Sequence, residues 1–124
     1  MIPTVLQVAF GGAIGTAARY GMGVAWFRPS AGFPVGVLAV NVAGSFLMGL
    51  IVVYLGQKML SHFNPFLMTG VLGGFTTFSA FSLEAYTLFE RGAVGHAATY
   101  VALSVILSIT ALVAGIFIMR GLLA

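Results

Sequence analysis

The chain of 124 residues is 60% hydrophobic and only 6% charged, with a formal net charge of +3. This composition excludes a water-soluble domain, because too few charged side chains are available to cover a folded surface in water. The few basic residues are spread thinly along the chain, which excludes nucleic acid as a partner. The chain contains no cysteine, so disulfides and thiolate metal sites are excluded as well.

Four apolar segments follow one another, and each is longer than the roughly 20 residues that a transmembrane helix needs. We expect residues 1–124 to form one all-α membrane domain of four transmembrane helices with short connections. The first segment has neither a positive n-region nor a clear cleavage site, so it should stay in the membrane as a helix. The expected helices are Thr4–Phe27, Val35–Gln57, Pro65–Glu90 and His96–Met119.

The basic residues at the ends of these segments favour neither orientation in the membrane. With both termini on one side, that side carries Lys58 and Arg120, and the opposite side carries Arg28 and Arg91. Equal numbers give the positive-inside rule nothing to act on. Either the topology is unique but weakly encoded, or the chain inserts both ways and assembles as an antiparallel dimer.

Chain length and small residues both bear on assembly. Four helices can barely enclose a pore and also shield it from lipid, so we expect a homo-oligomer. Small residues spaced four apart allow close helix packing and indicate no more than that. These pairs are Gly11 and Gly15, Ser45 and Gly49, and Gly70 and Gly74.

The third segment carries the most distinctive pattern, Gly-Gly-Phe-Thr-Thr-Phe-Ser-Ala-Phe-Ser over residues 73–82. Paired glycines followed by hydroxyl residues make a poor helix interior, so we expect the helix to be broken near Gly73–Thr77. Backbone that is unwound inside a membrane must be satisfied by protein, ions or water, and such breaks usually line a path or a site. Phe75, Phe78 and Phe81 should place their rings on one side of the resumed helix.

Three polar residues at membrane depth are functional candidates, because burying such groups in lipid is costly. Asn41 in the second segment either makes an interhelical hydrogen bond or lines an ion path. Arg19 near the end of the first segment either extends to the interface or attracts anions into a vestibule. Glu84 in the third segment is a possible protonation site, although we favour a hydrogen-bond acceptor that orients neighbouring hydroxyls.

The last segment carries a polar stripe. Tyr100, Ser104 and Ser108 recur every four residues, so their hydroxyls share one helix face and are expected to line a path. The alternative for each serine is a bond to its own backbone. His62 and His96 lack metal-ligand spacing and are expected at the interface, and no catalytic motif is present, so we do not expect an enzyme.

Amide and hydroxyl donors together with electropositive ring edges suit a small, strongly hydrated anion, whereas unwound carbonyls suit a cation. Over nearly its whole length the chain resembles the Fluc/CrcB fluoride channels. The residues that carry the resemblance are Gly11-Gly12, Gly15, Arg19-Tyr20, Gly36, Leu38, Asn41, Gly44, the segment 73–82, Glu84, Tyr100, Ser104 and Ser108.

The resemblance implies a dual-topology antiparallel homodimer in the bacterial inner membrane, with two pores for passive export of fluoride. It also implies ring-edge fluoride contacts at Phe78 and Phe81 and a structural sodium ion at the dimer centre on the carbonyls of Gly73 and Thr76. The remaining path residues that it implies are Asn41, Ser79, Ser82, Glu84, Tyr100, Ser104 and Ser108. Ala80 and Val37 stand where the family commonly has hydroxyl residues, so the polar track should be thinner here.

Two alternatives come from other functional classes. A dual-topology small multidrug transporter has a similar size, but it needs a carboxylate in its first helix, and residues 4–27 contain none. A non-transporting assembly subunit would explain the packing glycines. It would not explain the polar residues at membrane depth.

Overall fold

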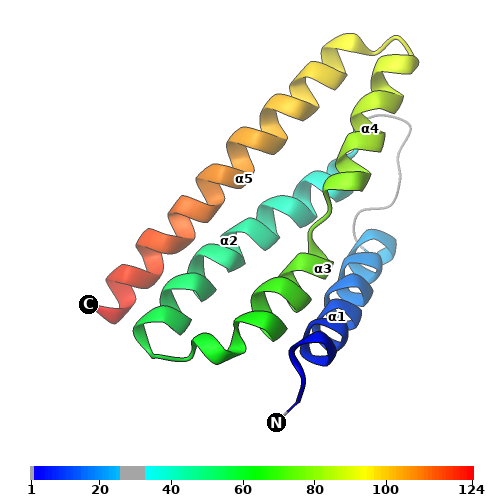
Figure 1. Cartoon of the computed structure of the whole chain (residues 1–124). Coiled ribbons are helices and arrows are strands. Elements are labelled where there is room, and N and C mark those ends of the chain that lie inside the picture. Colours follow the sequence, from blue (N-terminus) through cyan, green and yellow to red (C-terminus); the bar gives the residue numbers. More distant parts are fainter. Residues whose placement is uncertain (1, 26–32) are drawn as a thin grey trace.

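The computed structural model describes residues 2–25 and 33–124, and over these residues the regular structure is entirely helical (Figure 1). The elements in chain order are α1 (Thr4–Ala25), α2 (Val35–Gln57), η1 (Ser61–Phe63), η2 (Pro65–Leu72), α3 (Gly73–Phe75), α4 (Phe78–Glu90) and α5 (Val94–Leu123). The helix predicted over Val35–Gln57 is confirmed at both ends. The predicted end of the first helix, at Phe27, lies outside the described residues.

Over residues 2–25 and 33–124, three helical runs are long and apolar enough to cross a membrane: α2, the run Ser61–Glu90 and α5. The described part of α1 has sufficient length but is not among them, because it carries Gln7, Arg19 and several glycines. α5 begins earlier and ends later than the predicted His96–Met119 and contains 30 residues. At about 1.5 Å per residue it is longer than the hydrocarbon core of a bilayer is thick, so it must tilt or protrude.

The third membrane run changes its helical partner part-way along its length. Its first half, η2 and α3, packs along α1, whereas its second half, α4, packs against α5. α2 and α5 lie side by side and run in the same direction, and the extended link between α3 and α4 passes over α2 (Figure 1). η2 is π-helical, a wider form that the sequence did not predict. The break is therefore the point where the two helix pairs of the chain are joined.

Glycines allow close contact within both helix pairs, α1 with η2 and α2 with α5. In the α1–η2 seam, a Cβ on Gly70 would lie 2.9 Å from the Cα of Gly11. In the α2–α5 seam, a Cβ on Gly115 would lie 3.2 Å from the Cα of Gly49 and nearer still to the carbonyl oxygen of Phe46. The small-residue spacing thus predicted close packing correctly. Both contacts lie within one chain, so the spacing supports no oligomer.

Tight turns fix where α4 ends and α5 begins. Gly92 has φ +80°, a left-handed conformation that glycine adopts without a steric penalty. Its N–H donates to the Phe89 carbonyl, and the N–H of Ala93 donates to the Leu88 carbonyl, which satisfies two carbonyls at the helix end. α5 therefore returns antiparallel to α4 and brings the polar stripe back beside the broken helix.

Candidate functional site

The predicted break in the third helix is present, but it is shorter than expected. Gly73 and Gly74 are helical, and only Thr76 and Thr77 are extended, with ψ angles of 159° and 123°. Gly74 also packs against α1, where an added Cβ would lie 2.7 Å from the Gly12 carbonyl oxygen. Phe75 ends the first half-helix and is buried. The expectation that it shares a face with the later phenylalanines is therefore wrong.

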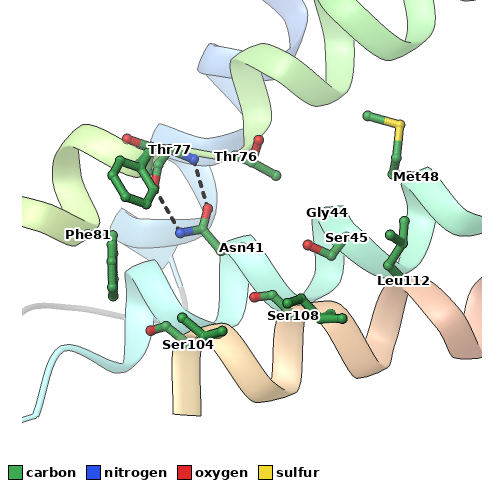
Figure 2. Close-up of a pocket in the computed structure, with 13 residues that line it drawn as sticks. Asn41, Gly44, Ser45, Met48, Thr76, Thr77, Phe81, Ser104, Ser108 and Leu112 are labelled. Carbon is green, nitrogen blue, oxygen red and sulfur yellow. Dashed lines mark hydrogen bonds between the residues drawn. The ribbon is translucent and has the colours of Figure 1, made fainter. Parts of the chain in front are cut away.

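Asn41 holds the unwound backbone through both ends of its carboxamide. Its Nδ2 donates to the Thr77 carbonyl oxygen over 2.8 Å, and its Oδ1 accepts from the Thr77 N–H over 2.8 Å. Figure 2 shows this pair of bonds linking α2 to the break. The interhelical bond considered for Asn41 is thus present. It leaves one of the two Nδ2 hydrogens without a partner among the described residues.

The break diverts the amide donors of two carbonyls. In an uninterrupted helix the Thr77 N–H would bond the Gly73 carbonyl, but it donates to Asn41. The Ala80 N–H would bond the Thr76 carbonyl, but it donates to Thr77 Oγ1 over 3.1 Å and so caps α4. The Gly73 and Thr76 carbonyls, predicted to hold a cation, therefore lose the helical donors that would otherwise satisfy them.

Arg19 lies on the other side of the break. Its Nε donates to the Gly74 carbonyl over 3.2 Å, and Thr16 Oγ1 donates to the same oxygen over 3.4 Å. The structure thus adds a contact for Arg19 that neither role considered for it, an interfacial residue or a vestibule charge, had included. Its guanidinium binds the carbonyl end of the first half-helix, where a positive charge is also favoured by the helix dipole.

A cavity of about 440 Å³ lies between α2, α5 and the break. Figure 2 shows Asn41 and Ser45 on α2, Ser104 and Ser108 on α5, and the threonine pair of the break bordering one space. Of the predicted path residues, the structure brings Asn41, Phe78, Phe81, Ser104 and Ser108 to this cavity. The other lining residues are Gly44, Ser45, Met48, Thr76, Thr77, Val105, Ile109 and Leu112.

The rings of Phe78, Phe81 and Tyr100 lie next to one another in space, beginning at the cavity. The ring centroid of Phe81 lies 5.3 Å from that of Phe78 and 5.3 Å from that of Tyr100. Phe78 is 78% exposed in the single chain, whereas Tyr100 is fully buried. Phe81 therefore links the cavity to the polar stripe of α5, and Phe78 presents most of its ring outside the chain.

The stripe on α5 contains two hydroxyls with unmet hydrogen bonds. Tyr100 Oη and Ser104 Oγ are buried and have no hydrogen-bond partner among the described residues. Ser104 therefore does not bond back to its own helix, which was the alternative for an isolated membrane serine. A buried hydroxyl without a partner costs about 1–3 kcal/mol. Ser104 lines the cavity, so its hydroxyl is available to a group that enters the cavity, whereas Tyr100 does not line it.

Three predicted path residues on α4 do not line the cavity. Ser79 and Ser82 are exposed; Ser79 Oγ contacts Thr77 Oγ1 at 3.3 Å, and Ser82 Oγ donates to the Phe78 carbonyl over 3.0 Å. Glu84 was expected to orient neighbouring hydroxyls, but within the described part of the chain no hydroxyl bonds to it. The nearest tyrosine in sequence, Tyr86, donates to Glu90 instead, over 2.7 Å.

The sequence reasoning missed two polar lining residues. Ser45 follows Asn41 by four residues, so the same periodicity that identified the stripe on α5 would have found it. Thr77 was expected in the unwound segment but not as the cap of the next helix. Its place before Phe78 is a usual N-cap signal, yet this signal becomes readable only once the break is located.

The cavity combines an amide N–H, several hydroxyls and ring edges with a broken helix, and it lies within a multi-pass membrane protein. This architecture is typical of membrane channels and transporters, where interrupted helices line the path. Among the described residues no group of three His, Asp or Glu side chains is placed to hold a metal ion. Any cation at the break would therefore depend on backbone carbonyls.

Comparison with known proteins narrows this class to one family. The family model described as CrcB-like protein, Camphor Resistance (CrcB), matches residues 6–116. A protein of Ruegeria sp. (strain TM1040) named fluoride-specific ion channel FluC is 62% identical over 125 residues, which cover 99% of each chain. Proteins with the same name from Cereibacter sphaeroides (strain ATCC 17029 / ATH 2.4.9) and Paracoccus denitrificans (strain Pd 1222) are 58% and 53% identical, covering 100% and 98% of each chain. The chain belongs to the CrcB family.

Proposed function

We propose that this protein is a fluoride-selective channel of the bacterial inner membrane that exports fluoride passively and so relieves fluoride toxicity. It is a channel and not an enzyme. The observation that carries the proposal is the cavity that joins Asn41, Phe81 and Ser104, in a chain whose full-length relatives are named fluoride-specific channels. These side chains supply hydrogen-bond donors and electropositive ring edges, which an anion requires when it leaves water.

The path runs from the break to the stripe on α5. The second Nδ2 hydrogen of Asn41 and the Ser104 hydroxyl donate to fluoride, and the ring edges of Phe78 and Phe81 contact it. Ser108 and Tyr100 extend the path along α5. The N-terminal end of α4, which starts at the break, adds a partial positive charge that favours an anion there. Ser79, Ser82 and Glu84 belong to the proposed path only beyond the cavity of the single chain. Arg19 contacts the Gly74 carbonyl and does not line the cavity, so we do not assign it to the path.

Sodium is proposed as a structural ion on the carbonyls of Gly73 and Thr76. The diverted donors at both positions support this fit, because an unsatisfied carbonyl in a membrane costs several kcal/mol. When bound, the ion would supply the positive partner that both oxygens lack. It would fasten the two half-helices at the break without being transported.

An antiparallel homodimer is proposed as the conducting unit. Phe78 supports it, because a ring that contacts fluoride but is 78% exposed in one chain needs a second chain to complete its surroundings. The balanced charges, Lys58 and Arg120 against Arg28 and Arg91, allow insertion in both orientations. The remaining exposed apolar side chains contact membrane lipid.

Fluoride efflux from liposomes tests the proposed function directly. Purified protein should release trapped fluoride, measured with a fluoride electrode, and should release trapped chloride far more slowly. Phe81→Ile should slow fluoride release strongly, because an aliphatic side chain keeps most of the volume but lacks the electropositive ring edge. Phe89→Ile is the matched control, since Phe89 lies on the same helix, is 57% exposed and does not line the cavity. Equal fluoride and chloride rates would refute the proposal.

A further inference from the structure

The Gly74 carbonyl accepts hydrogen bonds from side chains of α1, unlike the Gly73 and Thr76 carbonyls near it. In a continuous helix it would accept from the Phe78 N–H, but the two extended residues between them remove that donor. Arg19 and Thr16 on α1 replace it, with donor distances of 3.2 and 3.4 Å. The Gly73 and Thr76 carbonyls receive no such replacement from a side chain among the described residues.

We propose that Arg19 and Thr16 are positioning residues that hold the Gly74 carbonyl toward α1 and thereby leave the Gly73 and Thr76 carbonyls to bind the structural cation. The inference rests on the proposed cation site. Asn41 does the same for Thr77 from the α2 side, through two bonds of 2.8 Å. Side chains of two helices therefore select which oxygens of the break remain available.

The place of Arg19 supports positioning over anion attraction. The residue does not line the cavity between α2 and α5, and its Nε is engaged by a backbone oxygen. The glycine seam keeps α1 close enough for this bond, because a side chain on Gly74 would lie 3.0 Å from Thr16 Oγ1. Without these two donors, the Gly74 carbonyl oxygen has no side-chain hydrogen-bond partner among the described residues.

Charge and position predict opposite effects on cation affinity. If Arg19 acts only through its charge, removing it relieves repulsion, so sodium should bind more tightly. If Arg19 acts by position, removing it lets the Gly74 peptide rotate, so sodium should bind more weakly. Thr16→Val distinguishes the charge explanation from the positioning explanation, because it removes a hydrogen-bond donor to the Gly74 carbonyl and changes no charge.

Thermal unfolding in detergent gives an affinity that does not depend on transport. Sodium chloride replaces N-methyl-D-glucamine chloride at constant ionic strength, and the sodium concentration that gives half the stabilisation is measured for each variant. Arg19→Met should raise this concentration about tenfold, as expected when a hydrogen bond to a charged donor is lost. Thr16→Val should raise it less, and Arg19→Lys should fall between wild type and Arg19→Met. Tyr20→Phe, at a neighbouring position that is 74% exposed, should leave it unchanged.

Fluoride efflux at saturating sodium completes the test. Arg19→Met should then recover most of its rate, because positioning sets the affinity for sodium and leaves the anion path intact. Three results would each overturn the inference. The sodium concentration for half stabilisation could fall in Arg19→Met, or it could stay unchanged in both Arg19→Met and Thr16→Val. Efflux of Arg19→Met could also stay low at every sodium concentration. If Arg19→Met does not fold, Thr16→Val and Arg19→Lys must still raise the sodium concentration for half stabilisation. If the unfolding temperature of the wild type does not depend on sodium, both the proposed cation site and this inference are wrong. Fluoride efflux by the wild type would still test the proposed channel function.

Discussion

Replacing Asn41 should destabilise the break before it affects the rest of the chain. Asn41→Leu keeps a similar volume but leaves both the Thr77 N–H and the Thr77 carbonyl without their partner. An unsatisfied group costs about 1–3 kcal/mol when it is fully buried, and Thr77 is half-buried, so the variant should lose at most about 6 kcal/mol of stability. Ser45→Ala is the matched control, since Ser45 lines the same cavity one turn further along α2 and makes no hydrogen bond among the described residues.

Two measurements check this prediction. Thermal unfolding in detergent should show the loss for Asn41→Leu and little change for Ser45→Ala, and hydrogen exchange of the Thr77 amide should accelerate only in the former. In liposomes, Asn41→Asp should conduct fluoride less well than Asn41→Ser, because a carboxylate offers no N–H donor and repels an anion. Normal protection of the Thr77 amide in Asn41→Leu, or faster efflux for Asn41→Asp than for Asn41→Ser, would refute this reasoning.

Three further outcomes are expected. Gly49→Ala should lower the unfolding temperature strongly, because its Cβ would meet the Leu112 carbonyl, whereas Gly56→Ala in the same helix meets nothing within 4 Å and should not; equal effects would contradict the α2–α5 seam. A sodium gradient alone should not drive fluoride into liposomes, and accumulation would indicate a symporter in place of a channel. Two or three lysines added beside Lys58 should force the chain into one orientation and lower fluoride transport. Co-expression with a variant carrying lysines near Arg28 should restore transport. Full activity of the single-orientation variant alone would rule out the antiparallel dimer.

Local patterns were sufficient to predict the helices and the existence of the break. The bounds of α2 follow from an apolar run flanked by Pro34 and Lys58, which depends only on neighbouring residues. The hydroxyls of Tyr100 and Ser104 were placed on one face by helical periodicity alone, and both are buried together in the structure. Such features need no knowledge of distant contacts.

The details of the site depend on contacts between residues far apart in the chain. The break begins only at Thr76, and the glycine at position 74, which suggested an earlier break, instead lets α1 approach the first half-helix closely. The bonds of Asn41 to Thr77 and of Arg19 to Gly74 join residues 36 and 55 positions apart. The sequence alone shows that each of these residues can donate or accept a hydrogen bond, but it does not show that the two residues of each pair lie in contact. The same holds for the seams, where glycine spacing cannot say whether the partner helix belongs to the same chain.

The internal location of both glycine seams would allow each chain to fold before it pairs with another. An inserted chain can close its tightest helix contacts by itself, so it can exist in the membrane as a folded species before it meets another copy. If conduction requires two chains, pairing is a second-order step, and its rate grows with the square of the number of chains per membrane area. A cell that makes few copies would then hold inserted but silent protein, and fluoride tolerance would rise more steeply than expression.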